Sequence, residues 1–182
     1  LQKGQRISLK KEAPSLTKLM CGLGWDIAEK SGGLWGIFQS QADFDLDSSV
    51  LCLNTSNKLN NKSDLVYYGN LNHNSSAITH LGDNLTGKGE GDDEQILVNL
   101  PKIPANIFKL IFVINIYDSL KRNQDFSQVK NAFVRLVDIV NNKEIARYTL
   151  SGTDYQGKTG MILAEVYRHN EEWKMAAIGE GM

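Results

Sequence analysis

Length and charge limit what this chain can be. Its 182 residues suffice to bury the core of one domain, and no proline-rich, serine-rich or strongly charged linker divides it. The 20 basic and 21 acidic residues leave a formal net charge of −1, which gives no electrostatic reason to bind nucleic acid or an anionic membrane surface. The sequence has no apolar run of about 18 residues and no signal-peptide-like start, so we expect one cytoplasmic domain over residues 1–182.

Short apolar or alternating runs, bounded by Gly, Asn, Asp and Ser, recur along the whole chain, which is typical of an all-β protein. The expected strands are residues 7–10, 18–24, 49–54, 64–68, 77–80, 95–100, 109–117, 132–140, 144–150, 161–167 and 173–178. Helical patterns are limited to turns at 104–108 and 119–124. We predict a sandwich of two mainly antiparallel sheets, with short helical turns in the connections.

Three further features refine this prediction. Residues 109–116 are apolar on both faces and indicate a central strand, and residues 141–143 suggest a tight hairpin connection. Cys21 and Cys52 lie among apolar neighbours, so we expect two buried free thiols.

Residues 82–94 combine glycines with carboxylates. The segment reads Gly-Asp-Asn-Leu-Thr-Gly-Lys-Gly-Glu-Gly-Asp-Asp-Glu, so it contains five acidic residues and a single basic residue, Lys88. Glycines let backbone carbonyls turn inward, and carboxylates supply the charge that offsets the lost hydration of a divalent ion. The segment therefore predicts a calcium site, although a solvated acidic loop is the simpler alternative.

Neither of two familiar loop motifs fits this segment. An EF-hand beginning at Asp83 would need oxygen side chains where Leu85 and Gly87 stand, and a glycine where Lys88 stands. A phosphate-binding P-loop would need a Ser or Thr in place of Gly89, and a following helix that the sequence does not offer.

Further carboxylates are placed to join the acidic segment. Asp26 ends an apolar run, and Asp43, Asp45 and Asp47 alternate along the start of a strand, so all three face one side of it. Like charges on one strand face destabilise it unless a cation or solvent compensates them. Because loops gather at the ends of a sandwich, these groups can share an ion with residues 82–94.

These residues together resemble the TerD family of bacterial tellurite-resistance and general stress proteins. The blocks that carry the resemblance are Gly24-Trp25-Asp26, Phe44 to Ser49, Gly82 to Glu94, Ile116-Tyr117-Asp118, Asn131-Ala132-Phe133, Glu144 to Tyr148 and Glu165 to His169. They follow one another over nearly the whole chain. The resemblance implies a calcium-binding β-sandwich without established catalytic activity.

The resemblance also implies a ligand set for two Ca²⁺ ions and a class of partner. The implied metal ligands are Asp26, Asp45, Asp47, Asp83, Asn84, Gly89, Gly91, Asp92, Asp93 and Glu94, the glycines through their carbonyls. Asp118 lies in a matching block, as a ligand or as the cap of a turn. The implied partners are other stress-response or tellurite-resistance proteins, with a membrane-associated complex as one setting.

An enzyme is the competing interpretation. No Ser or Cys lies in a G-x-S-x-G motif, and no Cys/His pair has zinc-ligand spacing. We expect structural or surface roles for His73, His80 and His169. A metal-dependent enzyme acting on a phosphate ester or nucleotide is the alternative that stays open, because an acidic cation site can also hold magnesium and a phosphate. The expected function is a non-catalytic binding or scaffold module whose loops calcium orders.

Overall fold

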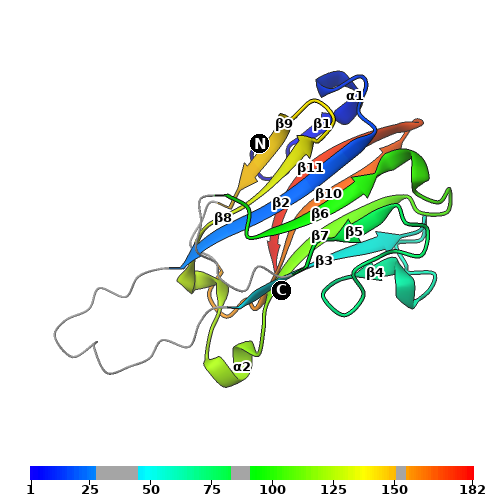
Figure 1. Cartoon of the computed structure of the whole chain (residues 1–182). Helices are drawn as coiled ribbons and strands as arrows, with labels where there is room; N and C mark the ends of the chain where they lie inside the picture. The colour runs from blue at the N-terminus through cyan, green and yellow to red at the C-terminus, as the bar shows by residue number, and fades with distance from the viewer. Residues whose placement is uncertain (28–44, 83–90, 151–154) are drawn as a thin grey trace.

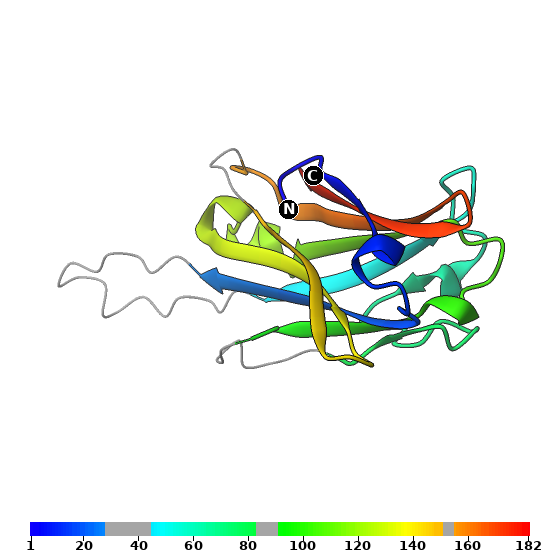
Figure 2. The same ribbon diagram turned by 90° about the horizontal axis from the view of Figure 1, so that it is seen from above.

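The fold is a sandwich of two antiparallel sheets, seen along its layers in Figure 2. The computed structural model describes residues 1–27, 45–82, 91–150 and 155–182. The first sheet has the order β1 (Arg6–Ser8), β11 (Glu172–Gly181), β10 (Gly160–His169), β7 (Lys109–Ile116), β3 (Leu46–Leu53), β4 (Leu65–Val66). The second has the order β5 (Ile78–His80), β6 (Glu94–Asn99), β2 (Lys18–Ile27), β8 (Val129–Asp138), β9 (Lys143–Thr149). The predicted fold class is confirmed.

Helical structure in the described residues is confined to short connections (Figure 1). These are α1 (Leu9–Glu12), α2 (Ser119–Arg122) and the 3-10 turns η2 (Lys62–Asp64), η3 (Leu100–Lys102) and η4 (Phe126–Gln128). The expectation of a strand at residues 7–10 was wrong beyond Ser8. The Ser8 hydroxyl accepts a hydrogen bond from the backbone N–H of Lys11 at 3.3 Å, and this N-cap starts α1 at Leu9.

One hydrophobic core lies between the sheets because alternate residues of each strand point inward. In β7, Leu110, Phe112 and Ile114 are buried, and β7 lies between β10 and β3, as expected of a central strand. Cys21 and Cys52 are buried free thiols, as predicted. Burial, with a smaller contribution from the charge of Asp64, raises the pKa of Cys52 to about 12.

Antiparallel pairing brings the acidic strand termini to one end of the sandwich. The first residue of β3, Leu46, pairs with the last residue of β7, Ile116, and the first residue of β6, Glu94, pairs with Leu23 near the end of β2. We call this the carboxylate end, defined by Asp26, Asp45, Asp47, Asp92, Asp93 and Glu94. The helix α2 belongs to it, whereas α1 lies at the opposite end (Figure 1).

At the opposite end, Arg168 holds the connection that crosses from the second sheet to the first. Its guanidinium donates hydrogen bonds to the carbonyls of Ile107 at 3.1 Å and Ile103 at 3.0 Å, and it lies 4.6 Å from the ring centre of Trp173. Burial lowers the pKa of Arg168. These interactions fix the connection between η3 and β7, because they give acceptor carbonyls outside the sheets a donor.

Candidate functional site

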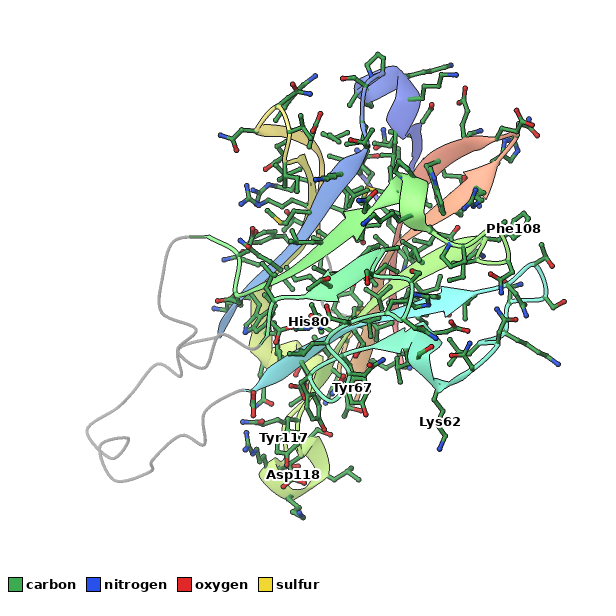
Figure 3. The ribbon with its side chains drawn as sticks, turned by 45° about the vertical axis from the view of Figure 1, so that its right-hand side comes forward. Lys62, Tyr67, His80, Phe108, Tyr117 and Asp118 are labelled. Atoms are coloured by element: carbon green, nitrogen blue, oxygen red, sulfur yellow. The ribbon has the colours of Figure 1, made fainter. Side chains whose placement is uncertain are left out.

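Two predicted ligands lie where β3 begins. The Tyr117 N–H donates to the carbonyl of Asp45 at 2.8 Å, so the start of β3 is joined to the end of β7 and to Asp118 just beyond it. Asp47 alternates with the core residues Leu46 and Ser48, as the sequence predicts, and is only 7% exposed. Tyr117 and Asp118 lie beside α2 at this end (Figure 3).

Asp118 occupies the N-cap position of α2 but does not cap it with its side chain. Its Oδ2 atom instead accepts a hydrogen bond from Nζ of Lys121 at 3.1 Å. Asp118 has a left-handed backbone, with φ of 53°. The residue therefore turns the chain out of β7 by its backbone, while its carboxylate stays at the surface.

Glu94 links the two sheets inside the carboxylate end. Its Oε2 atom accepts a hydrogen bond from the N–H of Ser48 at 2.7 Å and lies 3.4 Å from Nε2 of His80. The same nitrogen lies 2.9 Å from the Ser48 hydroxyl, and the N–H of Gly82 donates to Nδ1 of His80 at 3.0 Å. All three side chains are buried, so Glu94 fixes β6, β5 and β3 together at the root of residues 82–94.

The arrangement of Ser48, His80 and Glu94 differs from a catalytic triad. Because Gly82 donates to Nδ1, the proton of a neutral His80 must be on Nε2. That nitrogen then donates toward Ser48 and Glu94, whereas a general base must accept the serine proton there and receive its carboxylate on Nδ1. The geometry gives His80 a structural role, as expected, and in this arrangement His80 does not serve Ser48 as a general base.

Asp93 extends the pairing of β6 with β2 beyond Glu94. Its N–H donates to the carbonyl of Leu23 at 2.7 Å, and its Oδ2 atom accepts from the N–H of Trp25 at 2.8 Å. Asp93 is 8% exposed. Asp93 is thus held to β2 by one hydrogen bond of its backbone and one of its side chain.

Asp92 turns to the outer face of the second sheet and pairs with Arg135. The guanidinium donates to Oδ1 at 2.7 Å and to Oδ2 at 2.8 Å, and the amide of Gln95 donates to Oδ2 at 3.2 Å. The carboxylate lies over Gly22, where an added Cβ would come within 2.3 Å of it. The hydrogen bond to Asp92 raises the pKa of Arg135.

Charged side chains continue across β8 and β9 on this face. Arg135 reaches Oε2 of Glu144 at 3.4 Å, and Arg147 donates to the same carboxylate at 2.9 Å. The ring of Phe133 lies 4.4 Å from the Arg147 guanidinium and occupies the space over Gly24. Sequence reasoning missed this cluster, although the alternating glycines of Gly22-Leu23-Gly24 mark a strand face without side chains.

Some predicted ligands lie outside the described residues. These are Asp83, Asn84 and Gly89, together with Asp43, and only the backbone of Asp26 is described. In residues 1–27, 45–82, 91–150 and 155–182, no three His, Cys, Asp or Glu side chains are grouped so that they could hold a metal ion. Gly91 follows directly on the segment that is not described and has φ of 143°. The calcium site therefore stays a prediction, and a complete set of metal ligands would have to include residues from the segment 83–90.

The P-loop alternative also fails on secondary structure. A P-loop leads from a strand into a helix, whose N-terminus binds the phosphates. Here residues 82–94 lead from β5 into the strand β6. In the part of the chain that the structure describes, no helix is long and apolar enough to cross a lipid bilayer.

Comparisons with known proteins agree with the resemblance. The family model described as the TerD domain matches residues 1–182. The stress response protein SCP2 of Bacillus subtilis (strain 168) is 49% identical over 183 residues, which cover 100% of this chain and 91% of the relative. The tellurium resistance protein TerD of Serratia marcescens is 43% identical over 181 residues, which cover 100% of this chain and 89% of the relative.

Solved structures show the same fold at low identity. The SCO6318 protein of Streptomyces coelicolor A3(2), described as a homologue of a telluride resistance protein (TerD), superposes with a TM-score of 0.66 at 17% identity. The match covers 92% of this chain and 91% of that one. The SAV2460 protein, described as of unknown function, superposes with a TM-score of 0.68 at 18% identity over 92% and 90% of the two chains. With the match of the family model over residues 1–182, the identity to curated relatives establishes that this chain belongs to the TerD family.

Proposed function

We propose that this chain is a calcium-binding, non-catalytic stress-response module, in which Ca²⁺ orders the loops of the carboxylate end. The observation that carries the proposal is the convergence of acidic strand termini. The starts of β3 and β6 are joined by the hydrogen bond from the Ser48 N–H to Glu94, and Asp47 and Asp93 are their immediate neighbours. Buried carboxylates that approach one another from the two sheets favour a cation among them.

The donor set suits calcium in its chemistry. Ca²⁺ takes about six to eight oxygen ligands at flexible geometry, whereas Mg²⁺ uses one or two carboxylates and keeps its waters. In this proposal Asp45, Asp47 and Asp93 supply charge from the strand ends, and Asp83, Asn84 and the carbonyls of residues 87–91 complete one or two sites. Calcium would supply the positive charge that offsets the repulsion of these groups.

Asp92 and Glu94 have a different role in the proposal. Arg135 and Gln95 donate to the Asp92 oxygens, and the Ser48 N–H donates to Glu94. Outer groups of this kind orient the ligands of a metal without touching it. We therefore assign Asp92 and Glu94 to anchoring the acidic segment, although the resemblance implies them as ligands.

A binding role is favoured over catalysis by the His80 tautomer, in which His80 does not serve Ser48 as a general base. Two buried free thiols fit a reducing, cytoplasmic setting. The relatives are named as stress-response and tellurium-resistance proteins, and we propose that the surface ordered by calcium contacts other proteins of these classes.

The test is the thermal midpoint of chelator-stripped protein, titrated separately with calcium and magnesium. An ion that binds only the folded state stabilises it by about 2.7 kcal/mol at 100 times its dissociation constant. Asp45→Asn should reduce the shift caused by calcium, and the charge-matched control Glu171→Gln, at the exposed turn between β10 and β11, should not. A shift with magnesium alone would instead favour the enzyme acting on a phosphate ester or nucleotide. No shift with either ion would remove the calcium site.

A further inference from the structure

A second charged feature lies far from the carboxylate end, on the outer face of the first sheet. There β1, α1, β7, β10 and β11 enclose an open hollow of about 600 Å³. We call it the basic groove, defined by Arg6, Lys11, Lys109, Glu165, Tyr167 and Lys174. Its volume is within the range of about 300–1,000 Å³ found for small-molecule sites.

Strand register aligns the side chains of the groove. Ser8 pairs with Lys174, Lys174 with Tyr167, and Tyr167 with Lys109, so these residues form one row across four strands. The neighbouring row of Met175, Val166 and Leu110 is fully buried. Because successive residues of a strand face opposite sides, the Lys174 to Lys109 row faces outward.

The two lysines of this row are placed to bracket an anion. Lys109 and Lys174 are on β7 and β11, with Tyr167 on β10 between them. Two strand spacings separate their backbones by about 10 Å, and each lysine stem can lean over Tyr167 from its own side. An anion above Tyr167 would meet two ammonium groups and a phenolic hydroxyl donor.

The groove has a surplus of positive charge, although the whole chain has a formal charge of −1. Arg6, Lys11, Lys109 and Lys174 line it together with two carboxylates, Glu12 and Glu165. Lys109 pairs with Glu165 at 3.2 Å. Within the described residues, the side chains of Arg6, Lys11 and Lys174 form no ion pair, and four cations against two carboxylates leave the groove a surplus of two positive charges.

We propose that the basic groove binds a phosphate-bearing polyanion. Lysine ammoniums act as point charges for phosphate, and Arg6 on the edge strand β1 adds a planar guanidinium that can donate two hydrogen bonds to it. A ligand with several negative charges fits better than a single carboxylate, because it can engage Arg6 and Lys11 as well as the two lysines beside Tyr167. Lys109 can take part while it stays paired with Glu165, since an ammonium group has three donors. Such a ligand is either a free phosphate compound or the headgroup of an anionic lipid.

The first experiment measures binding of inorganic tripolyphosphate by calorimetry at low salt, with protein stripped of metal ions and dialysed free of chelator. The double variant Lys109→Gln/Lys174→Gln should raise the dissociation constant about tenfold, because it removes both ammonium groups beside Tyr167. The charge-matched control is Lys62→Gln/Lys102→Gln, whose residues line no part of the groove. Lys62 points away from the sandwich near β4 (Figure 3). Equal losses in the two double variants, or no binding by the wild type, would overturn the proposal.

A conservative variant guards against loss of fold. Tyr167→Phe keeps the ring and the charge and removes only the hydroxyl, so we expect a smaller loss of affinity with an unchanged thermal midpoint. Binding should weaken as salt is raised, since the groove is open to solvent. Affinity for tripolyphosphate that salt does not change would contradict an electrostatic site.

A second experiment separates the two sources of phosphate. Co-sedimentation with phosphatidylcholine vesicles, with and without phosphatidylglycerol, tests the headgroup. If the protein binds tripolyphosphate but does not sediment with the vesicles, the ligand is a soluble phosphate compound. If it sediments with the anionic vesicles and the Lys109→Gln/Lys174→Gln variant does not, the ligand is the lipid headgroup. The proposal would be overturned if the wild type bound neither probe but formed a dimer, and if the Lys109→Gln/Lys174→Gln variant were a monomer. A second copy of the chain would then occupy the groove. Both experiments omit calcium, so their outcome does not depend on the proposed metal site.

Discussion

The carboxylate of Asp92 lies where a side chain on Gly22 would have to be. A Cβ atom built on Gly22 would come 2.3 Å from the carboxyl carbon of Asp92, far inside van der Waals contact. Glycine at this position of β2 therefore leaves the space in which the Asp92 carboxylate reaches Arg135.

Replacing Gly22 by alanine should displace Asp92 and disrupt its pair with Arg135. Because Asp92 is fully buried and Arg135 is 26% exposed, we expect a loss of about 2–4 kcal/mol in the free energy of unfolding. Urea unfolding measures it. The control is Gly160→Ala in β10, where the nearest atom to the added Cβ, at 3.1 Å, is the end of the flexible Met182 side chain. Equal and small losses in both variants would show that Asp92 has room to move.

Glu94 should stabilise the fold independently of any metal ion. Glu94→Ala leaves the buried N–H of Ser48 without its acceptor, and an unpaired group of this kind costs about 1–3 kcal/mol. The Nε2 atom of His80 loses one of its two acceptors and keeps the Ser48 hydroxyl. Glu94→Gln keeps one acceptor oxygen and should lose less. The measurement is urea unfolding in the presence of chelator. A Glu94→Ala protein as stable as the wild type would remove the linking role assigned to this residue.

Glu144 should contribute a pH-dependent part of the stability. The hydrogen bond from Arg147 lowers the pKa of Glu144, so its contribution is present above the pKa of the unfolded chain and is lost as pH falls through the folded pKa. Its side chain is 37% exposed, which limits the effect of Glu144→Gln at pH 7 to about 1 kcal/mol or less. Unfolding curves at pH 7 and pH 3 should show the difference between variant and wild type only at the higher pH. A difference of the same size at both pH values would contradict the ion pair.

The thiols should be unreactive until the protein unfolds. With the pKa of Cys52 raised to about 12, only about one thiol in ten thousand is ionised at pH 8, and burial shields it further. Burial also raises the pKa of Cys21. A disulfide reagent that reports free thiols should label neither residue in native protein and both in urea. Rapid labelling of native protein would show that the core opens readily.

The fold could be predicted from the sequence because its signals are local. Alternation of apolar residues and the turn residues between them predict each described strand to within a few residues. The start of α1 was missed because one hydroxyl, that of Ser8, outweighs an apolar pattern that continues through Leu9. Asn142 has a left-handed backbone in the turn between β8 and β9, as expected because asparagine tolerates this conformation better than most residues.

The candidate site could be predicted only in part, because its contacts join residues that are far apart in sequence. Composition alone placed the acidic segment and the carboxylates of β3. The partners of those groups do not follow from composition, since Arg135 is 43 residues from Asp92 and Ser48 is 46 residues from Glu94. Register and sheet order, which periodicity does not specify, decide which of these residues meet.

The cap that Arg168 places on residues 103–107 affects how the chain is made as well as how it is held. The arginine follows Ile107 by 61 residues, so this crossover between the sheets has no cap until those residues have been synthesised. On a ribosome, β6 and η3 therefore emerge well before the side chain that secures their exit. Docking of the two sheets is therefore expected to follow synthesis of the hairpin of β10 and β11, and the apolar faces of the earlier strands stay exposed until then.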